Sequence, residues 1–256
     1  SGMTIMVGGF GVCGLPENLL HALAETDARD LSLISNNGSV EGWGNGRLIA
    51  NGQVRKMYSS YIGENDVLTG KLIAGEIEVE LVPQGTLAER IRAAGAGIPA
   101  FFTPTGFGTA IAEGKESREF NGRGCILETA LNADVAFIKA YKADKKGNLV
   151  FRKTARNFNP IMATAAKTTI VEVEEIVAGL HACAEVENMA SAEGARDNKE
   201  KLERLWTCFV DNQDINADPR ARNPPESVRN FQKSIVKHPP PLPTCPSPPP
   251  PPAPPA

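Results

Sequence analysis

The chain has 256 residues, of which 41% are hydrophobic, and it carries a formal net charge of −3 at pH 7. This length and composition allow one large hydrophobic core or two small ones. The small acidic excess argues against a protein that binds nucleic acid or an anionic membrane surface, because such proteins usually carry a basic patch. We therefore expect neither a nucleic-acid partner nor a membrane partner.

The sequence holds no run of about 18 apolar residues, so we expect no transmembrane helix. The N-terminus lacks a basic stretch followed by a long apolar one, so we expect no signal peptide and a protein that is not secreted. The first predicted strand begins almost at the first residue. This predicts that the natural chain has a further N-terminal segment, with any targeting peptide that it carries.

The five cysteines predict neither a zinc site nor a disulfide framework. Their number is odd and none forms a Cys-x-x-Cys pair, so free thiols in a reducing compartment fit better and no bound metal is expected.

The chain begins with an apolar run at residues 4–7, which predicts a buried strand. An amphipathic run at residues 17–25 follows Pro16 and predicts a helix with proline in its first turn. Between the two lie four glycines, Gly8, Gly9, Gly11 and Gly14. Glycines after a strand let the main chain approach a ligand closely, and a helix N-terminus at that point favours anions.

The rest of the ordered pattern repeats the strand, turn and helix unit. Strands are predicted at residues 31–35, 54–61, 76–82, 96–108, 120–128, 133–139, 149–151 and 168–173, and helices at residues 68–74, 87–94 and 159–166. Thr86, with Glu89 three residues later, predicts a capping box for the second of these helices. The segment 38–52 is rich in glycine and is interpreted as a loop that holds at most a short helix. The pattern predicts an α/β fold with an open, largely parallel twisted sheet and helices on both faces.

Ligands of parallel sheets bind beyond the carboxyl ends of the strands. The glycine turn, Asn36-Asn37, Gln84-Gly85 and Thr105-Gly106 each follow a predicted strand. We therefore expect these four groups to converge on one edge of the sheet.

The composition changes after the last predicted strand. Residues 1–177 form the predicted domain, residues 178–237 are polar and charged, and residues 238–256 are nearly all proline. A polyproline run makes no backbone hydrogen bonds of its own, so an extended, solvated tail is expected, with a ligand for a proline-binding partner as the alternative.

Gly9, Gly11 and Gly14 match the G-x-G-x-x-G spacing of dinucleotide-binding folds. That fingerprint expects an acidic residue at the end of the second strand, where this chain has Asn36-Asn37. We therefore rank a nucleotide-binding domain of another enzyme below a site for a different ligand that carries phosphate or carboxylate.

Several long segments, in order along the chain, resemble those of family I coenzyme A transferases. These are residues 3–18, 35–38, 59–65, 78–92, 99–109, 118–122 and 151–159. They are similar to the A-type half of the 3-oxoacid members of that family, and the resemblance runs from residue 1 to about residue 177. It implies the CoA-transferase fold and the transfer of CoA from succinyl-CoA to a 3-oxoacid such as acetoacetate.

In the family this resemblance points to, a glutamate forms an acyl anhydride and then a glutamyl-CoA thioester. The resemblance places that glutamate in the B half, in a Ser-Glu-Asn-Gly context that this chain lacks. Glu64, in Gly63-Glu64-Asn65, matches a different motif of the A half. We therefore expect no catalytic residue in this chain and no cofactor beyond the CoA thioester substrate. The expected partner is a B subunit, in a heterotetramer or higher assembly.

The resemblance also implies which residues bind substrate or CoA. They are Gly8, Gly9, Phe10, Gly11, Asn36, Asn37 and Gln84. Side-chain amides and backbone N–H groups can hold a substrate carboxylate or a developing oxyanion without adding a competing charge. Without the resemblance, a plain turn at Asn36-Asn37 and a solvated loop residue at Gln84 are the simpler interpretations.

Two segments depart from the family pattern. Asn45 and Arg47 lie in residues 38–47, where the family has small and apolar residues, and they question the packing there. From residue 178 the chain does not continue into the family's final strand, and a sheet without that strand has an unpaired edge. A truncated A domain that acts as a non-catalytic interaction protein is therefore the alternative function. The compartment implied is the mitochondrial matrix for a eukaryotic source and the cytoplasm for a bacterial one.

Overall fold

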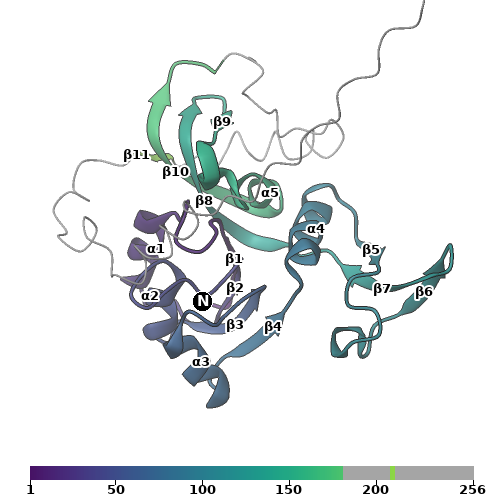
Figure 1. Cartoon of the computed structure of the whole chain (residues 1–256). Helices are drawn as coiled ribbons and strands as arrows, with labels where there is room; N and C mark the ends of the chain where they lie inside the picture. Colours follow the sequence, from purple (N-terminus) through teal and green to yellow (C-terminus); the bar gives the residue numbers. More distant parts are fainter. Residues whose placement is uncertain (181–207, 211–256) are drawn as a thin grey trace, which may run out of the picture. The chain divides into compact units, whose positions relative to one another are not determined.

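The computed structural model describes residues 1–180 and 208–210, and these form the α/β fold that the sequence predicts (Figure 1). The main sheet has eight strands. Seven lie in the order β11-β10-β8-β1-β2-β3-β4 and pair in parallel, while β9 pairs antiparallel with β8. The strands are β1 (Thr4–Val7), β2 (Leu31–Ile34), β3 (Val54–Ser59), β4 (Glu78–Leu81), β8 (Ala133–Asp144), β9 (Leu149–Val150), β10 (Ala166–Val177) and β11 (Cys208–Val210).

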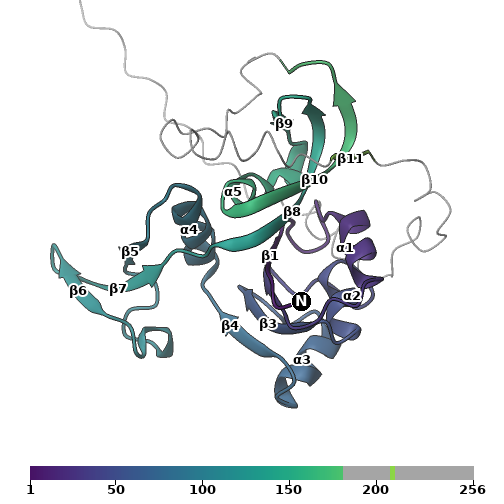
Figure 2. The same cartoon turned by 180° about the vertical axis from the view of Figure 1, so that it is seen from behind.

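Helices cover both faces of this sheet, as expected (Figures 1 and 2). They are α1 (Glu17–Ala24), α2 (Asn45–Ala50), α3 (Asp66–Ile73), α4 (Gln84–Gly95) and α5 (Asn159–Ala163), with short 3-10 turns η1 (Ala110–Ala112) and η2 (Lys153–Arg156). Alternate residues of β1 enter different cores. Ile5 and Val7 pack with buried residues of α1, α2 and α3, whereas Met6 packs with those of α4 and α5. This alternation is the normal consequence of a strand covered on both faces.

A second, antiparallel sheet of three strands stands apart from the main sheet, beyond α4, in both views (Figures 1 and 2). It contains β5 (Ala100–Thr103), β6 (Ser117–Phe120) and β7 (Arg123–Thr129), in the order β5-β7-β6. The predicted hairpin at residues 120–128 therefore belongs to this sheet, with its first strand placed slightly earlier than expected.

The predicted capping box at Thr86 is wrong. Helix α4 begins at Gln84 directly after Pro83, and Thr86 lies inside it, buried, with a hydroxyl oxygen that has no hydrogen-bond partner among the described residues. Proline has a fixed φ and cannot continue a strand ladder, so the chain turns from β4 into the helix at that residue.

The last predicted strand is longer than expected because its charged end still has a partner. Strand β10 pairs with β8 from Ala166 beside Ala133 to Val177 beside Asp144. At the solvent end, Lys142 Nζ lies 2.7 Å from Glu175 Oε2. Charged residues continue a strand when a neighbour of opposite charge lies across from them.

Strand β11 pairs in parallel with β10 over three residues and covers part of the edge that the sequence predicted to be open. The predicted segment 178–237 is otherwise almost wholly outside the described residues, and the predicted polyproline tail, 238–256, lies entirely outside them. In the described part of the chain, no helix has the length and apolar character needed to cross a membrane.

Arg90 of α4 joins the two sheets. Its Nη1 donates to Glu80 Oε1 of β4 at 2.8 Å, and its Nε donates to the Thr129 carbonyl of β7 at 2.7 Å. Its Nε also lies 3.7 Å from Glu128 Oε2, and Glu128 is only 2% exposed. Lys115 supplies the second cation, with Nζ 2.6 Å from Glu128 Oε1. A buried carboxylate depends strongly on such partners.

Arg90→Met should lower the free energy of unfolding by about 3 kcal/mol, because it keeps the apolar stem but removes a cation from the buried Glu128. Arg92→Met on the same helix is the control. Arg92 is 51% exposed and pairs with Glu89 at the surface, so its loss should cost less than about 1 kcal/mol. Urea unfolding of the three proteins measures both values, and equal losses would contradict the assigned role of Arg90.

Candidate active site

Three of the four predicted groups lie at one edge of the main sheet. Strands β1, β2 and β4 run in parallel, so the turns that follow them share the carboxyl edge. The glycine turn follows β1, Asn36-Asn37 follows β2 and Gln84 follows β4. Thr105-Gly106 does not join them, because it follows β5 of the second sheet. That part of the prediction is wrong, since the period of the strands does not reveal which sheet they enter.

The glycine loop, defined as residues 8–14, is a closed turn. The Gly8 N–H donates to the Phe137 carbonyl of β8 at 2.9 Å, and Phe10 and Cys13 exchange two backbone hydrogen bonds of 3.0 and 2.9 Å. Gly9 and Gly11 have φ values of +117° and +61°. Side chains rarely adopt such angles, so glycine is required at both positions. The predicted tight turn is confirmed.

The anion expected at the N-terminus of α1 belongs to this chain. Glu172 of β10 is buried, and its Oε2 accepts from the N–H groups of Asn18 at 2.9 Å and Leu19 at 3.4 Å. Its Oε1 lies 2.8 Å from Lys139 Nζ. Because this carboxylate already uses the positive end of the helix, the N-terminus of α1 is not available to a ligand in the way that the sequence suggested.

Asn36 and Asn37 are only 4% and 6% exposed, so they do not form a plain solvated turn. The Asn36 carbonyl accepts from the Ser60 N–H and the Ser59 hydroxyl, both at 3.0 Å. Asn37 Oδ1 accepts from the Ser39 N–H at 3.2 Å. Both residues are thus held by the turn after β3 or by their own loop.

The departure at residues 38–47 supports this turn and does not disturb it. Asn45 is fully buried, and its Nδ2 donates to the Asn37 carbonyl at 3.1 Å. Arg47 Nη1 makes a 3.2 Å contact with His21 Nδ1. The doubt raised by these two polar residues is therefore resolved by partners from α1 and the preceding loop.

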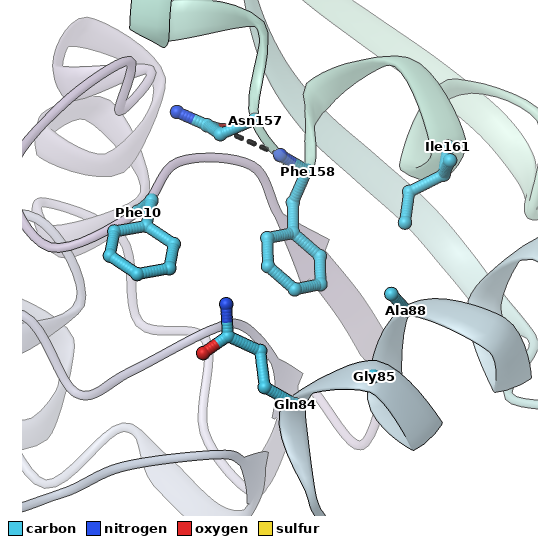
Figure 3. Close-up of a pocket in the computed structure, with 7 residues that line it drawn as sticks. All are labelled: Phe10, Gln84, Gly85, Ala88, Asn157, Phe158 and Ile161. Carbon is cyan, nitrogen blue, oxygen red and sulfur yellow. Dashed lines mark hydrogen bonds between the residues drawn. The ribbon is translucent and has the colours of Figure 1, made fainter. Parts of the chain in front are cut away.

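A pocket of about 420 Å³ lies between the glycine loop and the starts of α4 and α5 (Figure 3). It is lined by Phe10, Gln84, Gly85, Ala88, Asn157, Phe158 and Ile161. Gln84 is the first residue of α4, and its side chain extends toward the rings of Phe10 and Phe158 (Figure 3). Of the seven predicted site residues, Phe10 and Gln84 line this pocket, whereas Gly8, Gly9, Gly11, Asn36 and Asn37 lie outside its lining.

The lining contributed by residues 157–161 was missed by the sequence reasoning. The segment 151–159 was singled out as a motif, but none of its residues was assigned to the site. An aromatic residue between two asparagines, Asn157-Phe158-Asn159, is the signal that could have drawn attention to it.

The pocket lining contains amide and apolar side chains and no ionisable one. Glu64 is exposed and lies outside it. Burial raises the pKa of the Glu17 carboxyl, although the Arg47 guanidinium opposes this, and Glu17 also lies outside the lining. No group of three potential metal-ligating side chains occurs within the described ranges. The arrangement can bind a ligand and orient it, but this pocket supplies no carboxylate nucleophile of its own.

Comparison with known sequences decides the family. A sequence model described as "Coenzyme A transferase" matches residues 1–190. The chain belongs to the coenzyme A transferase family. This membership decides against the alternative of a nucleotide-binding domain from another enzyme, in agreement with the absence of an acidic residue directly after β2.

Two bacterial relatives of this transferase chain are similar over most of their length. It is 52% identical over 232 residues to the A subunit of "Succinyl-CoA:3-ketoacid coenzyme A transferase" from Xanthomonas campestris, covering 91% of this chain and 89% of the relative. It is 58% identical over 176 residues to the "Probable" subunit of the same name from Bacillus subtilis, covering 69% and 74%. A human relative, "Succinyl-CoA:3-ketoacid coenzyme A transferase 2, mitochondrial", is 53% identical over 194 residues, but the chain spans only 38% of its length.

Solved structures support the fold. An acyl-CoA transferase from Escherichia coli O157:H7 superposes with a TM-score of 0.66 at 22% identity, covering 82% of this chain and 44% of that one. Glutaconate coenzyme A-transferase from Acidaminococcus fermentans gives a TM-score of 0.61 at 17% identity, covering 93% of this chain and 83% of that one. At these identities the likeness concerns the fold, and the predicted CoA-transferase fold is confirmed.

Gly8→Ala tests the close packing of the glycine loop in this transferase chain. A Cβ at Gly8 would collide with the carboxamide of Asn159, so the substitution should cost about 1–3 kcal/mol of stability. Gly70→Ala in α3 is the control, because a Cβ there meets nothing within 4 Å, and alanine should stabilise that helix by up to about 1 kcal/mol. Thermal unfolding should show shifts of opposite sign. A fall of equal size in both variants would refute the collision.

Proposed function

We propose that this chain is the A component of a 3-oxoacid CoA transferase, which moves CoA from succinyl-CoA to a 3-oxoacid such as acetoacetate. The observation that carries the proposal is the pocket between Phe10 and Gln84, which offers an amide and apolar surface beside the glycine loop but no carboxylate. A B component supplies the nucleophilic glutamate and closes the site. The bacterial relatives are named as one of two lettered components, and those names support the same division of labour.

The chemistry explains why a neutral wall is useful. The glutamate of the B component attacks the thioester carbonyl of succinyl-CoA, and the CoA thiolate leaves as an acyl anhydride forms. The thiolate then attacks the glutamyl carbonyl of the anhydride and releases succinate, which leaves a glutamyl-CoA thioester. The acceptor carboxylate repeats these steps in reverse and takes the CoA. Every step brings an anion to a carbonyl, so a further carboxylate in the wall would oppose it.

Gln84 is suited to orient the substrate carboxylate. Its carboxamide has two N–H donors, and its place at the start of α4, beside Phe10 and Phe158, directs it into the pocket (Figure 3). The glycine loop, Asn36 and Asn37 complete the proposed wall. Their backbone and amide groups lie at the same edge of the sheet and stabilise the developing oxyanion or hold the CoA.

The proposed partner is a B subunit, in a heterotetramer or higher assembly. The short span of the human relative that the chain covers supports a separate second component. The proposed compartment is the mitochondrial matrix for a eukaryotic source and the cytoplasm for a bacterial one. The alternative, a non-catalytic interaction protein, depends on the tail, which lies outside the described residues.

Mixing this chain with a matching B subunit should produce acetoacetyl-CoA from succinyl-CoA and acetoacetate. Absorbance of the enolate of the product follows the reaction. This chain alone should give no product, because the proposed nucleophile is absent from it. No activity in a mixture of two folded proteins would favour the non-catalytic alternative, and activity without the B subunit would show that the nucleophile has been misplaced.

In an active mixture, Gln84→Ala should lower kcat/KM by about tenfold to about a hundredfold, the usual value of a hydrogen bond to a charged group. Gln84→Glu keeps the shape and should lower it further, since it places a second anion beside the substrate carboxylate. Glu89→Gln on the same helix removes only a surface ion pair with Arg92 and is the control. Sedimentation checks that assembly is unchanged. A Gln84→Ala mixture as active as the control would remove Gln84 from the site.

A further inference from the structure

The glycine loop is held in place by a residue that does not line the pocket. Asn159, the first residue of α5, is fully buried. Its Oδ1 accepts from the Lys139 N–H of β8 at 2.8 Å. Its Nδ2 donates to the Gly14 carbonyl at 3.0 Å and to the Ala155 carbonyl at 2.8 Å. One carboxamide therefore connects β8, the end of the glycine loop and η2.

The same carboxamide occupies the space beside the start of the loop. A Cβ built on Gly8 would meet Asn159 Oδ1 and Cγ before any other atoms. Asn159 thus contacts the loop at both ends, by packing at Gly8 and by a hydrogen bond at Gly14. A side chain that touches both ends of a seven-residue turn determines where its backbone lies.

A second contact acts on the middle of the loop. Asn157 Nδ2 donates to the Cys13 carbonyl at 3.0 Å and to the Thr154 carbonyl at 2.9 Å. The Cys13 thiol also lies 3.2 Å from the Thr154 hydroxyl. The Asn157 backbone has a φ of +20°, which few residues other than glycine and asparagine adopt. The segment 154–159 therefore grips the loop over most of its length.

We propose that Asn159 is a positioning residue for CoA transfer, which sets the backbone of the glycine loop without touching the substrate. The inference rests on the proposed function, in which that loop forms part of the wall of the active site. Donors that stabilise a transition state must keep their positions closely, and a displacement of about 1 Å can cost about a hundredfold in rate. Displacing the loop should therefore lower kcat more than it changes KM.

Asn159→Asp is the informative variant. It has the same shape and keeps an acceptor for the Lys139 N–H, but it replaces the Nδ2 donor by an oxygen that faces the carbonyls of Gly14 and Ala155. The loop should be pushed away from the new carboxylate by this repulsion.

The chain contains a matched control. Gln53 is also fully buried, and its Nε2 donates to the carbonyls of Leu23, Thr26 and Ala28 at 3.1, 3.2 and 3.2 Å. It directly precedes β3, so it lies at the amino edge of the parallel strands, away from the pocket. Gln53→Glu makes the same chemical change at a purely structural position and should lower the stability by a similar amount.

Two measurements test the proposal on the full chain. In the active mixture, Asn159→Asp should lower kcat by about tenfold to about a hundredfold with KM changed by less than about threefold, while Gln53→Glu keeps the wild-type kcat. In this chain alone, hydrogen exchange of residues 8–14 should be faster in Asn159→Asp and unchanged in Gln53→Glu.

The outcomes separate the two proposals. Equal kcat and equal exchange of residues 8–14 in the two variants would overturn the positioning role. If the wild-type mixture transfers no CoA, the proposed function fails, and hydrogen exchange alone then supports or overturns the positioning of the loop. If Asn159→Asp does not fold, Asn157→Asp takes its place, since it removes the donor to Cys13. Faster exchange of the loop in that variant supports the clamp, and unchanged exchange overturns it.

Discussion

The contact between Gly8 and Asn159 is the constraint on which the candidate site depends. The chain leaves β1 at Gly8, whose N–H is bound to β8, and the space where a side chain would stand is taken by the carboxamide of α5. The loop that follows has no freedom to move toward the sheet. Its other side faces the region where α4 begins, and the pocket lies between them. Glycine at this point is therefore a packing requirement, in addition to the backbone angles at Gly9 and Gly11.

The second wall of the pocket is set by Pro83. Because proline ends β4 and α4 starts at the next residue, Gln84 stands in the first turn with its side chain directed toward Phe10 (Figure 3). The first wall is backbone held by asparagines, and the second is an amide on a helix. Neither wall carries a charge in the lining. Such a surface fits a reaction in which a carboxylate nucleophile arrives from another component and meets substrates that are anions themselves.

The charged groups of the chain are used elsewhere in the structure. Glu172 satisfies the N-terminus of α1 and pairs with Lys139 across two strands. Arg90 and Lys115 hold the buried Glu128 between the two sheets. Buried carboxylates of this kind persist because each has a cation or several N–H donors close by. They anchor the helices and sheets that carry the pocket, while the pocket itself is lined by neutral side chains.

Local patterns in the sequence were enough to predict the element types, the parallel α/β arrangement, the glycine turn and the family, because hydrophobic period, proline and glycine act locally and the family motifs are long. They also pointed to Gln84 and Phe10, which the fold brings together. Long-range packing alone determines that Thr105-Gly106 belongs to another sheet, that Glu172 uses the N-terminus of α1, and that Asn157 and Asn159 hold the glycine loop. These are contacts between residues more than 100 positions apart or choices between sheets, and no local pattern encodes them.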